Sequence, residues 1–195
     1  MRNHIKMFEE FIPLGTDFDY WIKTLNKLGY NITDKLSGGH YGFCYLTDNK
    51  KVIKVSFHRG DALAAHKLKN LKNEYLVDYY DVIRFVDKSK NIKMSYIIEM
   101  EYLDKKPDKK KLVDAFKLFY KAVRSKLPYN LYPNSYVRDF LKIKKEATTK
   151  GVSLDLQNYG NFLIKNNHLC AIDIGVQWDG LLSSSENSIP LIDFS

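Results

Sequence analysis

The chain has 195 residues, of which 45% are hydrophobic and 28% are charged. This length suits one domain or a small domain with two lobes, and the composition excludes a disordered chain. No apolar run approaches the ~18 residues that a membrane span needs, so we expect no contact with a membrane. The N-terminus has no signal-peptide pattern and the two cysteines lie far apart, which favours a cytoplasmic protein.

The net charge is +8, from 31 Lys and Arg against 23 Asp and Glu. Such a surplus favours phosphate-bearing or acidic partners. The surplus is mainly lysine, whereas bidentate readout of bases and phosphates is arginine chemistry, so the sequence argues against nucleic acid as a partner. The densest lysine cluster, at 105–111, precedes an apolar-periodic segment, and a solvated loop with a first helical turn accounts for it.

Apolar spacing predicts a helix over 17–28, with Thr16 as its N-cap and Gly29 as its end. From Lys35 onward, a glycine-rich turn and alternating apolar residues predict strands over 36–46 and 52–57. A short helix is then expected over 61–71, followed by strands over 79–86 and 94–101.

Helical spacing returns from Leu112 and again from Tyr136, with Asp108 and Ser135 as the expected caps. Past Gly151, a hairpin is predicted from strands over 162–164 and 169–172, joined by an Asn-Asn turn. The predicted order is therefore a helix, a strand-rich half, a helical half and a small hairpin, which is an α+β arrangement.

Three separate segments carry residue types suited to phosphate chemistry. In the first, the glycines of 37–42 let backbone amides approach phosphates, and the strand residue Lys54 supplies a cation. In the second, Asp155 is a candidate base for a hydroxyl proton and Asn161 offers an oxygen ligand for magnesium; in the third, Asp173 ends a strand with another such ligand. Taken singly, an ordinary glycine-rich hairpin with an exposed strand lysine explains the first segment, and a turn-capping Asp or Asn explains the second and the third.

In this order the segments resemble the signature set of the protein-kinase family: glycine-rich loop, strand lysine, catalytic loop and magnesium-binding aspartate. The segment 95–103 resembles the fifth strand and hinge of that fold, with Met100 as the gatekeeper. The resemblance covers about residues 35–175 and is closest to the small serine/threonine kinases of tailed bacteriophages.

The resemblance implies a protein kinase-like, two-lobed α+β fold in a single minimal domain. Its antiparallel-sheet N-lobe would span 35–103, after an N-terminal helical extension at 1–34. Its C-lobe would span 104–195 and be mainly helical and truncated, because little sequence follows Gly175 to build the helical platform that binds peptide substrates.

The resemblance also implies roles for named residues. Gly39 and Gly42 would cover the phosphates of ATP, and Lys54 would hold the α- and β-phosphates. The carbonyl of Glu101 and the amide of Leu103 would face the adenine edge.

In the catalytic loop, the resemblance makes Asp155 the catalytic residue that deprotonates the acceptor hydroxyl, and makes Asn161 and Asp173 the ligands of Mg²⁺. Asn158 is an alternative to Asn161, because the loop is one residue longer than usual.

The acidic partner of Lys54 is left open between Asp61 and Glu74. The leading hypothesis is an ATP- and magnesium-dependent kinase that phosphorylates serine or threonine of host proteins, encoded by a phage and acting in the bacterial cytoplasm. The alternatives are a pseudokinase-like module that binds and inhibits a host protein, and a phosphotransferase for a small hydroxylated molecule.

Overall fold

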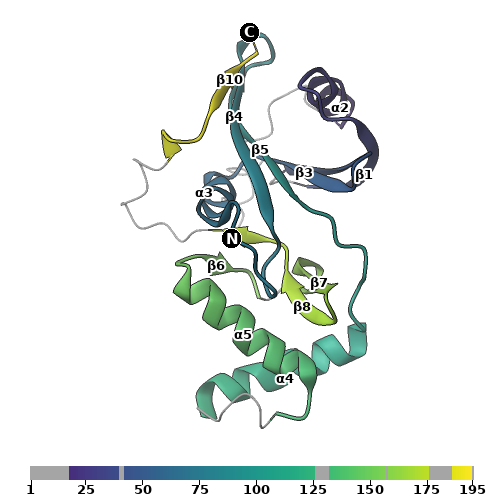
Figure 1. Cartoon of the computed structure of the whole chain (residues 1–195), viewed down its shortest axis with the longest axis vertical. Helices are drawn as coiled ribbons and strands as arrows, with labels where there is room; N and C mark the ends of the chain where they lie inside the picture. The colour runs from purple at the N-terminus through teal and green to yellow at the C-terminus, as the bar shows by residue number, and fades with distance from the viewer. Residues whose placement is uncertain (1–17, 40–41, 126–131, 157, 176–185, 195) are drawn as a thin grey trace, which may run out of the picture. The chain divides into compact units, whose positions relative to one another are not determined.

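The computed structural model describes residues 18–39, 42–125, 132–156, 158–175 and 186–194 (Figure 1). These residues form two compact units. Unit 1 comprises the described residues within 1–69, 79–102 and 178–195, and unit 2 comprises those within 70–78 and 103–177. The chain is a mixed α+β protein with an antiparallel-rich sheet, which confirms the fold class at this coarse level.

Unit 1 is built on a six-stranded sheet of order β1-β2-β3-β5-β4-β10. Its strands are β1 (Ile32–Gly39), β2 (Gly42–Thr47), β3 (Lys51–Ser56), β4 (Tyr79–Asp87), β5 (Ile92–Glu101) and β10 (Leu191–Asp193). The first five are joined by antiparallel pairs, as the alternating apolar pattern predicts, whereas β10 runs parallel to β4.

Two helices belong to unit 1, α2 (Phe18–Lys27) and α3 (Arg59–Leu68). In α2 the predicted apolar face is confirmed, because Trp21 and Leu25 are fully buried in the core cluster with residues of β2–β5. The ring of Trp21 meets Phe85 of β4 edge-on, with centroids 5.2 Å apart. Gly29 follows the helix with φ 91°, as a C-terminal stop requires, whereas the expected cap Thr16 lies outside the described residues.

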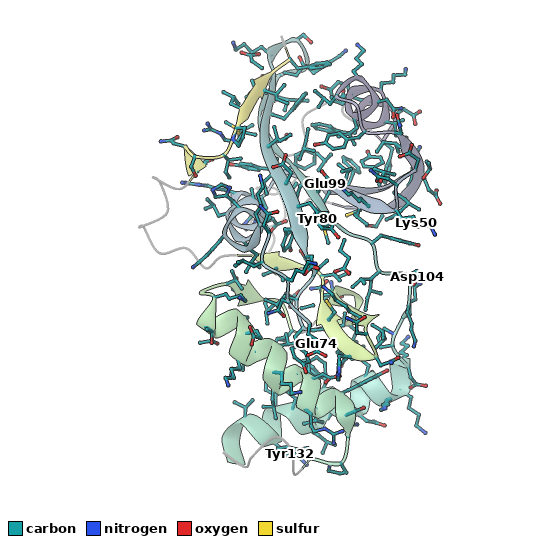
Figure 2. The ribbon with its side chains drawn as sticks, in the orientation of Figure 1. Lys50, Glu74, Tyr80, Glu99, Asp104 and Tyr132 are labelled. Atoms are coloured by element: carbon teal, nitrogen blue, oxygen red, sulfur yellow. The ribbon has the colours of Figure 1, made fainter. Side chains whose placement is uncertain are left out.

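Charged side chains also cross-link the strands of this sheet. Lys51 of β3 pairs with Glu99 of β5, and its Nζ lies 4.9 Å from the ring centroid of Tyr80 in β4. Glu99 and Tyr80 are labelled in Figure 2. Beside them, Lys69 Nζ is 2.6 Å from Asp81 Oδ1. These contacts hold the region around the start of β3 and the end of β5 in a defined geometry.

Unit 2 combines two helices with short strands. Its elements are α4 (Lys109–Ser125), α5 (Ser135–Thr149), β6 (Ser153–Leu154), a 3-10 turn (Tyr159–Asn161), β7 (Phe162–Lys165), β8 (His168–Ala171) and β9 (Ile174–Gly175). Phe140 of α5 is fully buried, and its ring packs against Phe119 of α4 and Phe162 of β7 at centroid distances of 5.5 and 5.0 Å. The predicted hairpin of β7 and β8 is confirmed, with both turn asparagines at positive φ.

The structure corrects one predicted cap and adds strands that the sequence did not predict. Asn134, not Ser135, caps α5, because its side-chain oxygen accepts a hydrogen bond from the backbone amide of Tyr136 at 2.9 Å. Asp108 does cap α4 as predicted, through the backbone amide of Lys111. The strand β1 begins at Ile32, before the glycine-rich segment, and the strands β6, β9 and β10 were not predicted.

The C-terminal end of the chain differs from the expected division into lobes. Residues 104–195 were assigned to the C-lobe, whereas β10 completes the sheet of unit 1 and the segment 70–78 belongs to unit 2.

None of the helices in the described ranges combines the length and the apolar character that crossing a bilayer requires.

Candidate functional site

Lys54 forms an ion pair with Asp61. Lys54 lies in β3 and Asp61 in the first turn of α3, and their Nζ and Oδ2 atoms are 2.8 Å apart. Both side chains are mostly buried, with exposed fractions of 17% and 14%. Of the two acids that the sequence left open, the structure therefore selects Asp61 as the partner of Lys54.

Two further side chains hold the carboxylate of Asp61. The hydroxyl of Ser56 donates to Oδ2 at 2.9 Å, and Nδ1 of His58 lies 3.1 Å from Oδ1. Burial raises the pKa of Asp61, but the hydrogen bond with His58 and the charge of Lys54 together lower it by more than burial raises it. The pKa of Asp61 therefore lies below its ordinary value. Asp61 is therefore ionised at neutral pH and fixes the ammonium group of Lys54.

Sequence reasoning missed Ser56 and His58. The available signal was their position, because short polar side chains between a strand and a helix commonly bond to the first turn of that helix. His58 is the N-cap residue of α3, but its side chain bonds to Asp61 rather than to a backbone amide.

The expected glycine loop lies at the end of the β1–β2 hairpin. Gly39 pairs with Gly42, and the two residues between them lie outside the described part of the chain. Gly42 has φ +148°, and a Cβ there would lie 1.9 Å from the carbonyl oxygen of Val55 in β3. The close approach of β2 to β3 is therefore enough to explain why this position is glycine, without any role in phosphate binding.

The expected hinge residues belong to different units. Glu101 ends β5 opposite Lys51, in unit 1. Leu103 begins the long segment of unit 2, and both residues are half-buried. The predicted gatekeeper Met100 is buried and pairs with Val52 and Tyr79 on the neighbouring strands.

Within unit 2, the structure brings Asp155, Asn161 and Asp173 together; we call these three residues the acid–amide cluster. The two-residue ladder of β6 and β9 pairs Leu154 with Ile174, so the next positions in its antiparallel register are Asp155 and Asp173. Short ladders of this kind carry no periodic signal in a sequence, which is why the sequence did not predict the pairing of β6 with β9.

Asn161 links the two aspartate segments. Its Nδ2 donates to the backbone oxygen of Asp155 at 3.2 Å and lies 3.5 Å from Oδ2 of the same residue. Its backbone oxygen accepts from the amide of Ile172 at 2.9 Å. Asn161 is buried, whereas both aspartates are exposed, so a fixed amide stands beside the solvent-accessible carboxylate of Asp155, and its backbone bonds to the residue before Asp173.

Asn158, the alternative to Asn161 as a magnesium ligand, caps a turn instead. Its side-chain oxygen accepts from the backbone amide of Gly160 at 3.0 Å and caps the 3-10 turn that leads to Asn161. Asn161, not Asn158, is therefore the amide that contacts Asp155.

The donor set of the acid–amide cluster fits Mg²⁺. Two carboxylates and an amide oxygen are hard ligands, and Mg²⁺ usually takes one or two protein carboxylates together with water and substrate phosphates. Because Nδ2 of Asn161 donates to Asp155, the side-chain oxygen of Asn161 is not used in that contact and can serve as a ligand. Within the described residues, no group of three or more His, Cys, Asp or Glu side chains offers an all-protein metal site.

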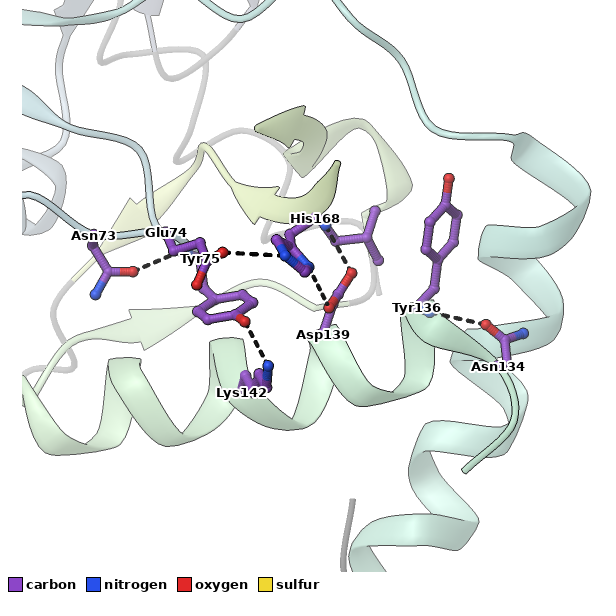
Figure 3. Close-up of polar contacts among 9 residues, drawn as sticks. Asn73, Glu74, Tyr75, Asn134, Tyr136, Asp139, Lys142 and His168 are labelled. Atoms are coloured by element: carbon purple, nitrogen blue, oxygen red, sulfur yellow. Dashed lines mark hydrogen bonds and ion pairs between the residues drawn. The ribbon is translucent and has the colours of Figure 1, made fainter. Parts of the chain in front are cut away.

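A second polar cluster in unit 2 shows the role of Glu74 (Figure 3). His168 of β8 lies between two carboxylates, with Nε2 3.1 Å from Glu74 and Nδ1 3.2 Å from Asp139 of α5. Next to it, Lys142 Nζ donates to the hydroxyl of Tyr75 at 2.6 Å, and this bond raises the pKa of Lys142. Glu74 and Tyr75 thus connect segment 70–78 to β8 and α5.

The sequence-predicted residues therefore form two local groups. Lys54 and Asp61 are paired in unit 1, and the acid–amide cluster is assembled in unit 2. Comparison with models of known protein families finds no match to this chain, and comparison with curated proteins finds no significant relative.

Proposed function

We propose that the chain is an ATP- and magnesium-dependent protein kinase that transfers the γ-phosphate to serine or threonine. The observation that carries the proposal is the acid–amide cluster, in which residues from two separate segments are suited to serve as the oxygen ligands and the base that phosphoryl transfer needs. The ion pair of Lys54 with Asp61 supports it from unit 1.

Phosphoryl transfer asks a protein mainly for positioning and for neutralisation of charge. Asp155 is exposed, and the amide of Asn161 orients it, so it is suited to accept the proton of an acceptor hydroxyl. Asn161 and Asp173 would hold Mg²⁺, which when bound neutralises charge on the phosphate oxygens.

Lys54 is assigned to the α- and β-phosphates. Its ammonium group is held by Asp61, so it is oriented before a nucleotide arrives. Gly39 and Gly42 are assigned to the phosphates, and the backbones of Glu101 and Leu103 to the adenine edge. In line with the resemblance to phage kinases, the proposed acceptors are host proteins in a bacterial cytoplasm.

The proposal is tested by transfer of labelled phosphate from ATP to the chain itself and to proteins of a bacterial extract. Asp155→Asn and Lys54→Met are expected to lower the rate by about 10²-fold or more, because each removes a group placed at the reaction. The matched controls are Asp114→Asn in α4 and Lys23→Met in α2, both exposed, and these should keep the wild-type rate.

The outcomes separate the competing functions. Transfer to small hydroxylated molecules and to no protein would identify a small-molecule phosphotransferase. Binding of magnesium and ATP with no transfer would identify a pseudokinase-like binding module. Full transfer by both Asp155→Asn and Lys54→Met would contradict the assignment of the site itself.

A further inference from the structure

The C-terminal segment 186–194 contacts helix α3 of unit 1. Glu186 accepts a hydrogen bond from the hydroxyl of Tyr96 in β5 at 2.5 Å through Oε1, and its Oε2 lies 2.7 Å from Nε of Arg59. Arg59 is the first residue of α3. One carboxylate therefore joins the sheet to the start of the helix.

The same segment also reaches the other end of α3. The hydroxyl of Ser188 lies 2.9 Å from Nε2 of His66, which is in the last turn of the helix. Both ends of α3 are thus in contact with residues 186–188.

The segment itself is firmly held by the sheet. The carbonyl of Ile189 accepts from the side chain of Arg84 at 2.9 Å, and that of Pro190 accepts from the backbone amide of Arg84 at 2.7 Å. Ile189 is fully buried, β10 then pairs with β4, and the ring of Phe194 lies 5.6 Å from that of Phe85. Glu186 and Ser188 therefore project from a fixed support.

Helix α3 needs such support, because it has ten residues and its N-cap makes no side-chain hydrogen bond to the backbone. Isolated helices of this length are marginal in water and depend on tertiary contacts. Arg59 lies in the same first turn as Asp61, so whatever fixes Arg59 also fixes the carboxylate that meets Lys54.

The contact between Glu186 and Tyr96 is shielded from water. Tyr96 is buried, and burial together with the hydrogen bond to Glu186 raises the pKa of its hydroxyl above the ordinary value. The hydroxyl thus stays a neutral donor to Glu186 over the physiological pH range.

We propose that segment 186–194 is an intramolecular clamp on α3, in which Glu186 is a positioning residue that keeps Asp61 against Lys54. Its effect on phosphate transfer rests on the proposed function, whereas its effect on Lys54 does not. Release of this clamp would loosen the ion pair of unit 1 without removing any group assigned to the nucleotide.

The first test measures Lys54 itself in the purified full chain. Acylation of each lysine by an amine-reactive ester is followed by mass spectrometry at a temperature well below unfolding. Glu186→Ala is expected to raise the rate at Lys54 and the amide exchange of α3 by about tenfold, since loss of a charged hydrogen bond favours local opening by roughly this factor. Glu186→Gln, which keeps the size and one oxygen, should give a smaller effect and serves if the alanine variant fails to fold.

The matched control is Asp193→Asn, which removes another acid of the same segment. Asp193 pairs with Lys88 of the β4–β5 turn at 3.1 Å. The Asp193→Asn variant should leave the acylation of Lys54 and the amide exchange of α3 at wild-type values. Unchanged acylation and exchange in the folded Glu186 variants, or an equal change in Asp193→Asn, would overturn the clamp.

The second test measures phosphate transfer by the same variants. Glu186→Ala is expected to raise KM for ATP or lower kcat about tenfold, because Lys54 loses its fixed orientation. If the wild type transfers no phosphate, the proposed function fails while acylation and exchange still decide the clamp. If the wild type is active and Lys54 responds to Glu186→Ala with no change in KM or kcat, the positioning role is wrong.

Discussion

At the scale of single residues, Lys54 and Asp61 form an ion pair that has lost most of its water. Such a pair is costly to break, because removal of one partner leaves the other charge buried. The hydroxyl of Ser56 and the ring of His58 complete the hydrogen bonding of the carboxylate. This local order is what a lysine needs to bind phosphate oxygens in one geometry.

The first prediction concerns Asp61→Asn. The variant should unfold with a free energy about 3 kcal/mol lower than that of the wild type at pH 7, because Lys54 is left in a mostly buried site. The pKa of Asp61 lies below 3.8, so the stabilisation is complete above about pH 4 and is lost as the pH falls through the folded-state pKa.

Urea unfolding between pH 7 and pH 2.5 measures this difference. The gap between the wild type and Asp61→Asn should narrow only in the acidic part of the range, while Asp114→Asn follows the wild type throughout. A gap that does not depend on pH would show that the charge of Asp61 is not what stabilises the pair.

The second prediction concerns Gly42. Gly42→Ala should lower the free energy of unfolding by at least about 3 kcal/mol, since the new Cβ would meet the backbone of Val55 and part β2 from β3. Gly29→Ala is the control, because its φ of 91° is strained but no atom lies within 4 Å, and it should cost only about 1–2 kcal/mol. Equal losses in thermal or urea unfolding would contradict this explanation of Gly42.

The candidate site could be predicted in part because its residues stand within or next to apolar strands. Lys54 was identified as a cation within a strand, Asp155 as a carboxylate of the polar loop before a strand, and Asp173 as the residue that ends one. Nothing local selects Asp61 over Glu74 as the partner of Lys54. That choice depends on tertiary structure, which assigns Asp61 to unit 1 and Glu74 to unit 2. Glu186 carries no sequence signal, because its contacts are made with residues far away in the chain.

At the scale of elements, the start of α5 shows how a cap is chosen. Two adjacent residues, Asn134 and Ser135, both have side chains that can cap a helix. The backbone of Asn134 is extended, and its side-chain oxygen accepts a hydrogen bond from the backbone amide of Tyr136 (Figure 3). Ser135 is therefore the first residue of the helix.

The third prediction separates the two residues. Asn134→Ala should lower the free energy of unfolding by about 1 kcal/mol, because the amide of Tyr136 loses its acceptor, whereas Ser135→Ala should change it by less than about 0.5 kcal/mol. Denaturant unfolding measures both. A larger loss in Ser135→Ala would return the cap to Ser135.

The helices and the antiparallel strands could be predicted because their burial follows a regular period. Trp21 and Leu25 face the core at helical spacing, and alternate residues of β2 are buried. The strand β10 has only three residues, too few to establish a period, and its parallel pairing with β4 joins segments far apart in the chain. The ladder of β6 and β9 is shorter still, so neither element has a pattern that sequence analysis can detect.

At the scale of the whole molecule, the charge is divided unequally. The sequence ranges 70–78 and 103–177, to which unit 2 belongs, carry 16 Lys and Arg against 9 Asp and Glu, a net charge of +7. The ranges 1–69, 79–102 and 178–195, to which unit 1 belongs, carry 15 against 14, a net charge of +1. The lysines of 105–111 are all exposed, in agreement with a solvated loop and first turn. The surplus that favours acidic partners is therefore concentrated in the unit that holds the acid–amide cluster.

The fourth prediction tests whether these lysines contribute to folding. Replacement of Lys106, Lys109 and Lys110 by Gln should change the free energy of unfolding by less than about 0.5 kcal/mol per site, because all three are exposed. The triple variant should elute earlier than the wild type from a cation exchanger. A cooperative loss of stability would show that the lysines have structural partners.

The central claim is that the acid–amide cluster holds magnesium for transfer of the γ-phosphate of ATP. The most direct measurement follows labelled phosphate from ATP into protein as Mg²⁺ is titrated, for the wild type and for Asp173→Ala. We expect transfer by the wild type that requires Mg²⁺, and loss of transfer in a folded Asp173→Ala at every Mg²⁺ concentration. Equal transfer by the two proteins, or transfer by the wild type without a divalent cation, would contradict the account.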